Sequence, residues 1–280
     1  MKMKTAAIQL GIRDGESVCD RKTRVEEEFV RMEREKRVPD LIMLPELWQC
    51  GFFHFEKYRD HGQEENGEMT VWLRSWAKRL GCMIHTGSFV ERSTKPVISG
   101  SEKNGCSEKE EKLFNTSLLI GRDGKILAKY RKVHLFGYES EEKRILRPGT
   151  RITEVETEFG KIGLATCYDL RFPEQFRRMT ELGAEIFLIT SAWPLQRLEH
   201  WKLFNQVRAL ENQSFLFSCN CGYEREGSCF AGHSMCVSPD GTVLAEAGET
   251  PEVLYAEIDT DQTEAYRKAF PSLADRVTLQ

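Results

Sequence analysis

The sequence contains no unbroken apolar run long enough to cross a bilayer, although 40% of its 280 residues are hydrophobic. Near the N-terminus, Gln9 and Arg13 interrupt the apolar residues before the hydrophobic core of a signal peptide could form. No linker divides the chain. We therefore predict one soluble domain over residues 1–280, with no membrane partner and a cytoplasmic location.

The sequence also lacks an excess of basic residues. It has 40 Lys and Arg against 44 Asp and Glu, so its formal net charge is −4, and a protein that binds the phosphate backbone would show a basic stripe. We find no glycine-rich phosphate loop of the Walker or dinucleotide type. These absences predict that the protein binds neither nucleic acid nor a nucleotide cofactor, and we expect no cofactor at all.

The nine cysteines, an odd number, do not suggest a disulfide framework, and they favour a reducing compartment. Five residues of types that bind zinc fall within one short stretch: Cys219, Cys221, Cys229, His233 and Cys236. Their spacing lacks the paired C-x-x-C or C-x-x-H units of a structural zinc site. We therefore expect no metal, and zinc analysis of the purified protein tests this alternative.

Strand-like and helix-like segments alternate along the chain, which predicts an α/β fold. Asp-Gly pairs at 123–124 and 240–241 lie between strand-like segments, as in hairpins, so the sheets should be mixed. The predicted strands cover 5–12, 40–46, 83–91, 114–121, 125–132, 185–193, 215–222 and the hairpin 232–248; the predicted helices cover a stretch ending near 36, 69–80, 173–183 and 198–213.

Three of these apolar strands end on a residue suited to covalent catalysis. Cys167 follows 162–166 at a strand-to-helix junction, where unpaired backbone N–H groups and the helix dipole favour a thiolate. Glu46 ends the apolar segment LIMLPE, and Lys132 lies inside the aromatic and apolar stretch KYRKVHLFGYE. Each residue alone has a plain alternative. Glu46 could be a carboxylate at a helix start, Lys132 could lie on a solvated strand edge, and Cys167 could be a small core residue. Together they predict a catalytic site.

The motifs around these residues resemble the nitrilase or carbon-nitrogen hydrolase superfamily, which carries a glutamate, lysine and cysteine triad. The similar segments are LPELW, YRKVHLF, CYDLRFPE and HWKLFNQVRALENQSF, and SAWPLQRLEHW resembles the omega-amidase branch. The resemblance implies a four-layer α-β-β-α sandwich of two mixed sheets. It also implies a homodimer, or a higher homo-oligomer, that pairs through the helices following the nucleophile, with the C-terminal tail, 260–280, at that contact.

An amide hydrolysed through a thioester on Cys167 needs a base, an acid and donors for the oxyanion. We assign the proton transfers to Glu46, and the oxyanion contacts to Lys132 and the backbone N–H of Tyr168. The family also carries a second glutamate. Spacing from Pro148-Gly149 favours Glu142, whereas counting from Lys132 favours Glu139, and Glu141 stays open.

For the substrate, a small amide that bears a carboxylate, Arg171 is a suitable bidentate cation and Trp193 a suitable wall. We expect His200 and Trp201 to support Glu46 or the core. Nitrilase or N-carbamoyl amide hydrolase chemistry on the same triad, or an inactive scaffold with this fold, are the alternatives. The segment 91–113 departs from the family pattern, and its composition predicts a flexible loop insertion.

Overall fold

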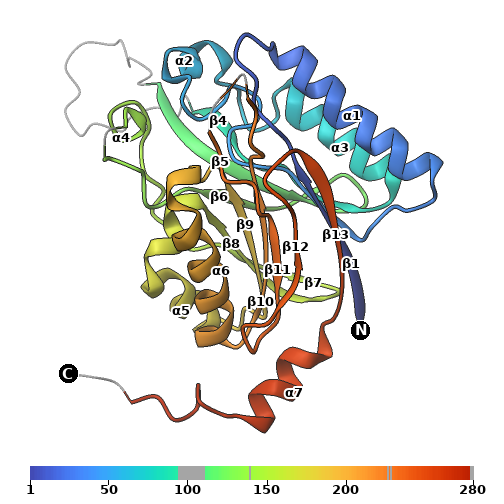
Figure 1. The fold of residues 1–280 in the computed structure, drawn as a ribbon, viewed down its shortest axis with the longest axis vertical. Helices are drawn as coiled ribbons and strands as arrows, with labels where there is room; N and C mark the ends of the chain where they lie inside the picture. The colour runs from blue at the N-terminus through green and yellow to red at the C-terminus, as the bar shows by residue number, and fades with distance from the viewer. Residues whose placement is uncertain (94–110, 139, 226, 228, 278–280) are drawn as a thin grey trace, which may run out of the picture.

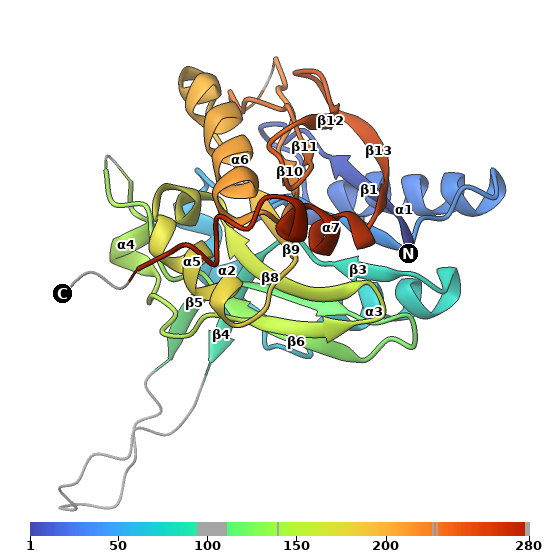
Figure 2. The same cartoon turned by 90° about the horizontal axis from the view of Figure 1, so that it is seen from below.

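The computed structural model describes residues 1–93, 111–138, 140–225, 227 and 229–277, and it contains two mixed β-sheets packed face to face with helices on both outer sides (Figures 1 and 2). The predicted α/β class and four-layer sandwich are confirmed. The first sheet has the order β13 (Glu252–Asp259), β1 (Lys2–Gln9), β2 (Leu41–Met43), β3 (Met83–His85), β5 (Lys112–Ile120) and β4 (Phe89–Ser93), with β6 (Ile126–Arg131) also paired to β5. The second has the order β12 (Val243–Glu246), β11 (Met235–Val237), β10 (Phe215–Asn220), β9 (Ile186–Ser191), β8 (Gly160–Thr166) and β7 (Glu154–Thr157).

The layers follow from which side of each strand is apolar. In β9, Ile186 and Leu188 pack between the sheets, whereas Phe187 and Ile189 pack under the outer helices. The strand is apolar on both faces, as expected for a parallel strand covered on both sides. Helices α1 (Val18–Arg34) and α3 (Glu68–Leu80) cover the first sheet, and α5 (Pro173–Glu181) and α6 (Leu198–Asn212) cover the second (Figure 1).

The predicted strand 83–91 is wrong in one respect, because the chain breaks it into β3 and β4 around Gly87. Gly87 has a φ of 65°, and a Cβ atom there would lie 2.1 Å from the carbonyl oxygen of Pro45. Only glycine permits this approach. The hydroxyl of Ser88 then accepts a hydrogen bond from the backbone N–H of Leu47 (3.1 Å). The break therefore shapes the turn that carries Glu46.

The predicted loop 91–113 is shorter than expected at both ends. Residues 94–110 lie outside the described residues, but Glu91 and Ser93 belong to β4 and pair antiparallel with Phe114 and Lys112 of β5. The C-terminal tail also contains structure, since α7 covers Asp261–Ala269. Arg267 fixes this helix: its guanidinium donates to the carbonyl oxygens of Ala184 (2.9 Å) and Gln213 (3.1 Å), among others.

His85 is a buried ionisable group whose two ring nitrogens have no hydrogen-bond partner among the described residues. Burial lowers the pKa of His85 to about 3, whereas an unfolded chain has a histidine pKa of about 6.5. The unfolded state therefore binds a proton that the folded state rejects, and stability falls as the pH drops from about 6.5 towards 3.

We expect His85→Leu to remove this pH-dependent loss in the free energy of unfolding. For a histidine pKa lowered to about 3, the loss is about 2 kcal/mol at pH 5. Urea unfolding at pH 7 and pH 5 should show a smaller loss of stability for His85→Leu than for the wild-type protein. The matched control is His61→Leu, since His61 is exposed at the end of α2 (Tyr58–His61). An equal loss in all three proteins would contradict the expectation.

Candidate active site

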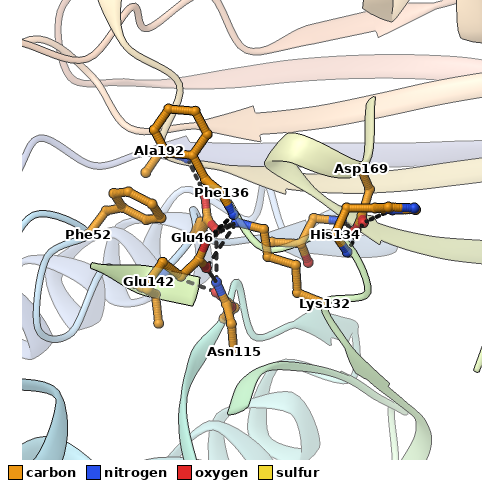
Figure 3. A network of polar contacts seen from close by, with 12 residues as sticks. Glu46, Phe52, Asn115, Lys132, His134, Phe136, Glu142, Asp169 and Ala192 are labelled. Carbon is orange, nitrogen blue, oxygen red and sulfur yellow. Dashed lines mark hydrogen bonds and ion pairs between the residues drawn. The ribbon is translucent and has the colours of Figure 1, made fainter. Parts of the chain in front are cut away.

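The predicted residues Glu46, Lys132 and Cys167 come from three separate strands of the two sheets and meet at one end of the sandwich. Glu46 follows β2, Lys132 follows β6, and Cys167 follows β8. The side chains of Glu46 and Lys132 are fully buried, and Lys132 Nζ lies 2.8 Å from Glu46 Oε1 (Figure 3). The structure therefore brings the predicted acid and ammonium into direct contact.

Two further donors hold the carboxylate of Glu46. The backbone N–H of Ala192, just after β9, donates to Oε2 (2.9 Å), and the side-chain amide of Asn115 in β5 donates to Oε1 (2.8 Å). Both sheets thus contribute to its position. Asn115 was not predicted from the sequence, because β5 also contains Thr116 and Ser117 and a polar side chain does not stand out there.

Glu142 is the candidate second glutamate that lies against Lys132. Its carboxylate accepts hydrogen bonds from Lys132 Nζ (3.0 Å to both oxygens), the side-chain amide of Asn115 (3.0 Å) and the backbone N–H of Phe136 (2.7 Å) (Figure 3). Glu141 instead pairs with Arg144 in a partly exposed position, and Glu139 lies outside the described residues. Lys132 is therefore shared between two buried carboxylates.

The charge of Lys132 depends on these neighbours. Burial by itself lowers the pKa of Lys132, but the negative charges of Glu142 and Glu46 outweigh it and raise the pKa above its usual value. Burial also raises the pKa of Glu142, and the charge of Glu46 acts in the same direction. Lys132 therefore stays an ammonium ion in this site.

Cys167 occupies a tight turn at the end of β8. Its φ of 48° lies in the left-handed region, which costs a non-glycine residue of order 1 kcal/mol. The turn continues as a 3-10 helix over Cys167–Arg171, and α5 begins only at Pro173. The backbone N–H of Thr166 donates to the carboxylate of Asp169 (2.8 Å), which closes the turn.

The prediction that the helix N-terminus keeps Cys167 as a thiolate is wrong. Burial raises the pKa of Cys167, the negative charge of Glu46 acts in the same direction, and Lys132 opposes them without cancelling them. A five-residue 3-10 helix contributes too few aligned peptide dipoles to reverse this. The resting group is therefore a thiol, which needs a base before it can act as a nucleophile.

Asp169 ties the segment of Lys132 to the turn of Cys167. It is fully buried and accepts hydrogen bonds from Tyr130 Oη (2.7 Å) and the backbone N–H of His134 (3.0 Å). The ring of His134 lies 2.8 Å from the same carboxylate (Figure 3). This ring also stacks on Phe172 with a centroid separation of 3.8 Å. The spacing between the catalytic candidates is thus fixed by a polar network.

A cavity of about 150 Å³ opens onto Cys167. Arg171 and Trp193, both predicted to contact substrate, line it together with Tyr168. The other lining residues are mostly apolar: Phe52, Phe53, Phe136, Tyr138, Ala192, Pro194, Gln196 and Arg197. Such a cavity suits a small substrate, since pockets for drug-sized ligands measure roughly 300–1,000 Å³.

His200 and Trp201 do not contact Glu46. The ring of His200 lies 3.5 Å from the guanidinium of Arg171, and Trp201 donates from its indole to the carbonyl of His233 (2.7 Å) while packing against Trp193. Their predicted role in the core therefore holds only for Trp201, which is fully buried.

The cysteine-rich stretch does not form a metal site within the part of the chain that the structure describes. Cys219 and Cys221 point at backbone carbonyl oxygens, and Cys229 is exposed. His233 bonds to Glu246 (2.6 Å). These side chains have separate environments, which is consistent with ordinary packing.

Most of the chain is similar in sequence to one family. The family model described as carbon-nitrogen hydrolase matches residues 4–268. The chain belongs to the carbon-nitrogen hydrolase family. As a carbon-nitrogen hydrolase, it is an enzyme, and the resemblance in its motifs is confirmed. Every helix among the described residues is too short or too polar to span a membrane.

Relatives of this carbon-nitrogen hydrolase carry more specific names. It is 34% identical to the 2-oxoglutaramate amidase of Paenarthrobacter nicotinovorans, over 98% of this chain and 90% of that protein. It is 32% identical to Omega-amidase NIT3 of Saccharomyces cerevisiae, over 98% of this chain and 93% of that protein. The crystal structure of S. cerevisiae Nit3, a member of branch 10 of the nitrilase superfamily, superposes with a TM-score of 0.83 at 29% identity, covering 96% of this chain and 94% of Nit3.

Proposed function

We propose that this enzyme hydrolyses the terminal amide of a small 2-oxo acid, such as 2-oxoglutaramate, and releases ammonia. The names of its relatives support this substrate class. The observation that carries the proposal is the floor of the cavity, where Cys167 lies beside Glu46 and Lys132 while Arg171 lines the same space. A nucleophile and a cation for a carboxylate thus share one small pocket.

In the first half of the proposed reaction, Glu46 takes the proton of the Cys167 thiol, and the sulfur attacks the amide carbonyl carbon. The oxygen of the tetrahedral intermediate then accepts from Lys132 Nζ and the backbone N–H of Tyr168. Glu46 gives its proton to the departing nitrogen, and ammonia leaves. The product of this half is a thioester on Cys167.

In the second half, Glu46 takes a proton from water as its oxygen attacks the thioester carbon. The C–S bond then breaks, Glu46 returns the proton to the leaving sulfur, and the carboxylic acid and the thiol are freed. Glu142 acts as a positioning residue, since it holds Lys132 Nζ and the amide of Asn115, the two groups that also bind Glu46. No cofactor takes part in these steps, and a metal is not needed to balance them.

A panel of three substrates tests the proposal: 2-oxoglutaramate, an N-carbamoyl amino acid and an aliphatic nitrile, each scored by ammonia release. We expect the 2-oxo amide to have the highest kcat/KM. A nitrile or a carbamoyl compound with the highest value would support the alternative chemistry on the same triad. No turnover of any of the three would overturn the proposed substrate class.

Arg171 is the proposed partner of the substrate carboxylate. We expect Arg171→Ala to raise KM for 2-oxoglutaramate about thirtyfold, because a charge-assisted hydrogen-bond pair contributes about 2 kcal/mol. For pentanamide, a neutral amide of the same chain length, KM should change little. Equal effects on both substrates would remove the proposed role.

We also propose a homodimer that pairs through α5, α6 and the C-terminal segment. Leu203 and Leu210 of α6 are 58% and 47% exposed, and they lie two helical turns apart on one face. Phe270, just after α7, is 60% exposed. Exposed apolar side chains that share one face of a helix support a protein contact there.

Light scattering should give a dimer for the wild-type enzyme and a monomer for the double variant Leu203→Glu/Leu210→Glu. The matched control is Val30→Glu/Val71→Glu on α1 and α3, where two exposed valines lie on the opposite helix layer. A wild-type monomer, or a Leu203→Glu/Leu210→Glu protein that stays dimeric, would contradict this pairing.

The proposed chemistry needs Cys167 reduced, and none of the described cysteines is in a disulfide. We therefore propose that the enzyme works in a reducing compartment such as the cytoplasm.

A further inference from the structure

A second guanidinium lines the cavity besides that of Arg171. Arg197 ends a 3-10 helix over Leu195–Arg197 and lies half-buried, with its guanidinium 5.9 Å from the ring centroid of Phe136. Its backbone is fixed, because its carbonyl oxygen accepts the indole N–H of Trp193 (2.8 Å) and its own N–H donates to Pro194 (3.1 Å). The position of this cation is therefore set by the wall of the pocket.

Within the part of the chain that the structure describes, no acidic side chain neutralises either guanidinium. No carboxylate of the described residues lies within 4.0 Å of Arg171 or Arg197, and none of the residues that line the cavity is acidic. Burial lowers the pKa of Arg171, and the positive charge of Arg197 acts in the same direction. The two groups are thus close enough to repel one another, and a bound anion would relieve both.

The two buried carboxylates nearby cannot neutralise Arg171 and Arg197. Glu46 and Glu142 are both engaged by Lys132 and Asn115. A positively charged group that entered the cavity would therefore meet two cations and no free carboxylate among the described residues. A group rich in acceptor oxygens would instead meet the N–H donors of two guanidinium groups, of which that of Arg171 has one contact, with the ring of His200 (3.5 Å).

We propose that Arg197 determines specificity by binding the 2-oxo oxygen of the substrate while Arg171 binds the adjacent carboxylate. This inference rests on the proposed function and names the part of the substrate that each cation recognises. A 2-oxo acid offers acceptors only, so both guanidinium groups can donate to it. The corresponding 2-amino acid amide carries an ammonium group at the same carbon, which both cations repel.

Three amides of the same length separate these contributions: 2-oxoglutaramate, the monoamide of glutaric acid, which lacks the oxo group, and glutamine, which carries the ammonium. We expect Arg197→Gln to lower kcat/KM for 2-oxoglutaramate about tenfold or more, chiefly through KM. For the glutaric monoamide the change should be no more than about threefold, because that substrate offers nothing at the second carbon. Activity on glutamine should stay equal or rise.

Arg197→Lys keeps the charge without the planar fork. It should retain the rejection of glutamine while losing part of the preference for the oxo group. Arg34→Gln, at the exposed end of α1, is the control and should behave as wild type. Thermal unfolding of each variant confirms that the fold is kept.

Failure of the inference and failure of the proposed function give different results. If the wild-type enzyme does not release ammonia from 2-oxoglutaramate, the proposed function is overturned. If the wild-type enzyme does so but Arg197→Gln keeps the same ratio of kcat/KM between the oxo and deoxy amides, only the role of Arg197 is overturned.

Discussion

Replacing Glu46 by glutamine should lower kcat by at least about a thousandfold, the upper part of the range for loss of a general base. The reason is the state of the nucleophile: burial and the charge of Glu46 keep Cys167 protonated, so the reaction waits on a base that glutamine cannot supply. Glutamine would also turn an N–H donor or a weaker acceptor towards Lys132 Nζ, which now lies 2.8 Å from a carboxylate oxygen.

Steady-state ammonia release measures this effect, and it should fall in Glu46→Gln. The rate of alkylation of Cys167 by iodoacetamide reports the state of the thiol separately: loss of the negative charge of Glu46 lowers the pKa of Cys167, so alkylation should not fall with ammonia release. Glu33→Gln, on the outer face of α1, is the matched control, because Glu33 pairs only with the surface residue Arg79. A Glu46→Gln enzyme within tenfold of wild type would show that another group activates the thiol.

Replacing Lys132 by methionine should cost both activity and stability. The ammonium holds two fully buried carboxylates, those of Glu46 and Glu142, at 2.8 and 3.0 Å. Removing one member of a buried ion pair costs about 3–5 kcal/mol, because the remaining charges are left without compensation. The loss of the oxyanion donor should lower kcat by a further factor of about 10² to 10³.

The pH dependence of this destabilisation has a definite sign. Without Lys132, one of the two carboxyl groups can stay buried only by keeping a proton, so its folded-state pKa rises above the unfolded value of about 4.3. A group of that kind contributes stability below the unfolded pKa, and the contribution is lost as the pH rises. Lys132→Met should therefore lose more stability relative to wild type at pH 8 than at pH 5.

Thermal unfolding of Lys132→Met at both pH values gives this comparison. The control is Lys125→Met, at an exposed position in the turn before β6, which should match wild type at each pH. Equal melting temperatures for Lys132→Met and wild type at pH 8 would mean that the buried carboxylates do not depend on this cation.

Glu46, Lys132 and Cys167 could be predicted from sequence because each follows an apolar strand, and strand ends are where side chains leave a sheet. Their environment could not. Whether Cys167 is a thiol or a thiolate depends on how deeply other segments bury it and on the distance to Glu46, and neither quantity is a local property. Asn115 was missed for the same reason, since its contacts with Glu46 and Glu142 join distant segments, and the place of Arg197 in the cavity likewise depends on segments distant in the sequence.

The fold, too, has features that the local sequence predicts and features that depend on contacts between distant segments. Periodicity predicted the alternation of strands and helices, and Asp-Gly turns predicted mixed sheets, but the stacking of two sheets followed only from the family resemblance. The break at Gly87 was not predictable, because it arises from the approach of Pro45 from another part of the chain.

Trapping the acyl group on Cys167 is the most direct measurement of the central claim. After rapid acid quench of the enzyme with 2-oxoglutaramate, mass spectrometry of the peptide that contains Cys167 should show the added mass of the acyl group. The adduct should disappear as substrate is consumed, and Cys167→Ala should show neither the adduct nor ammonia release. Wild-type turnover by Cys167→Ala, with no added mass on any peptide, would contradict catalysis through this sulfur.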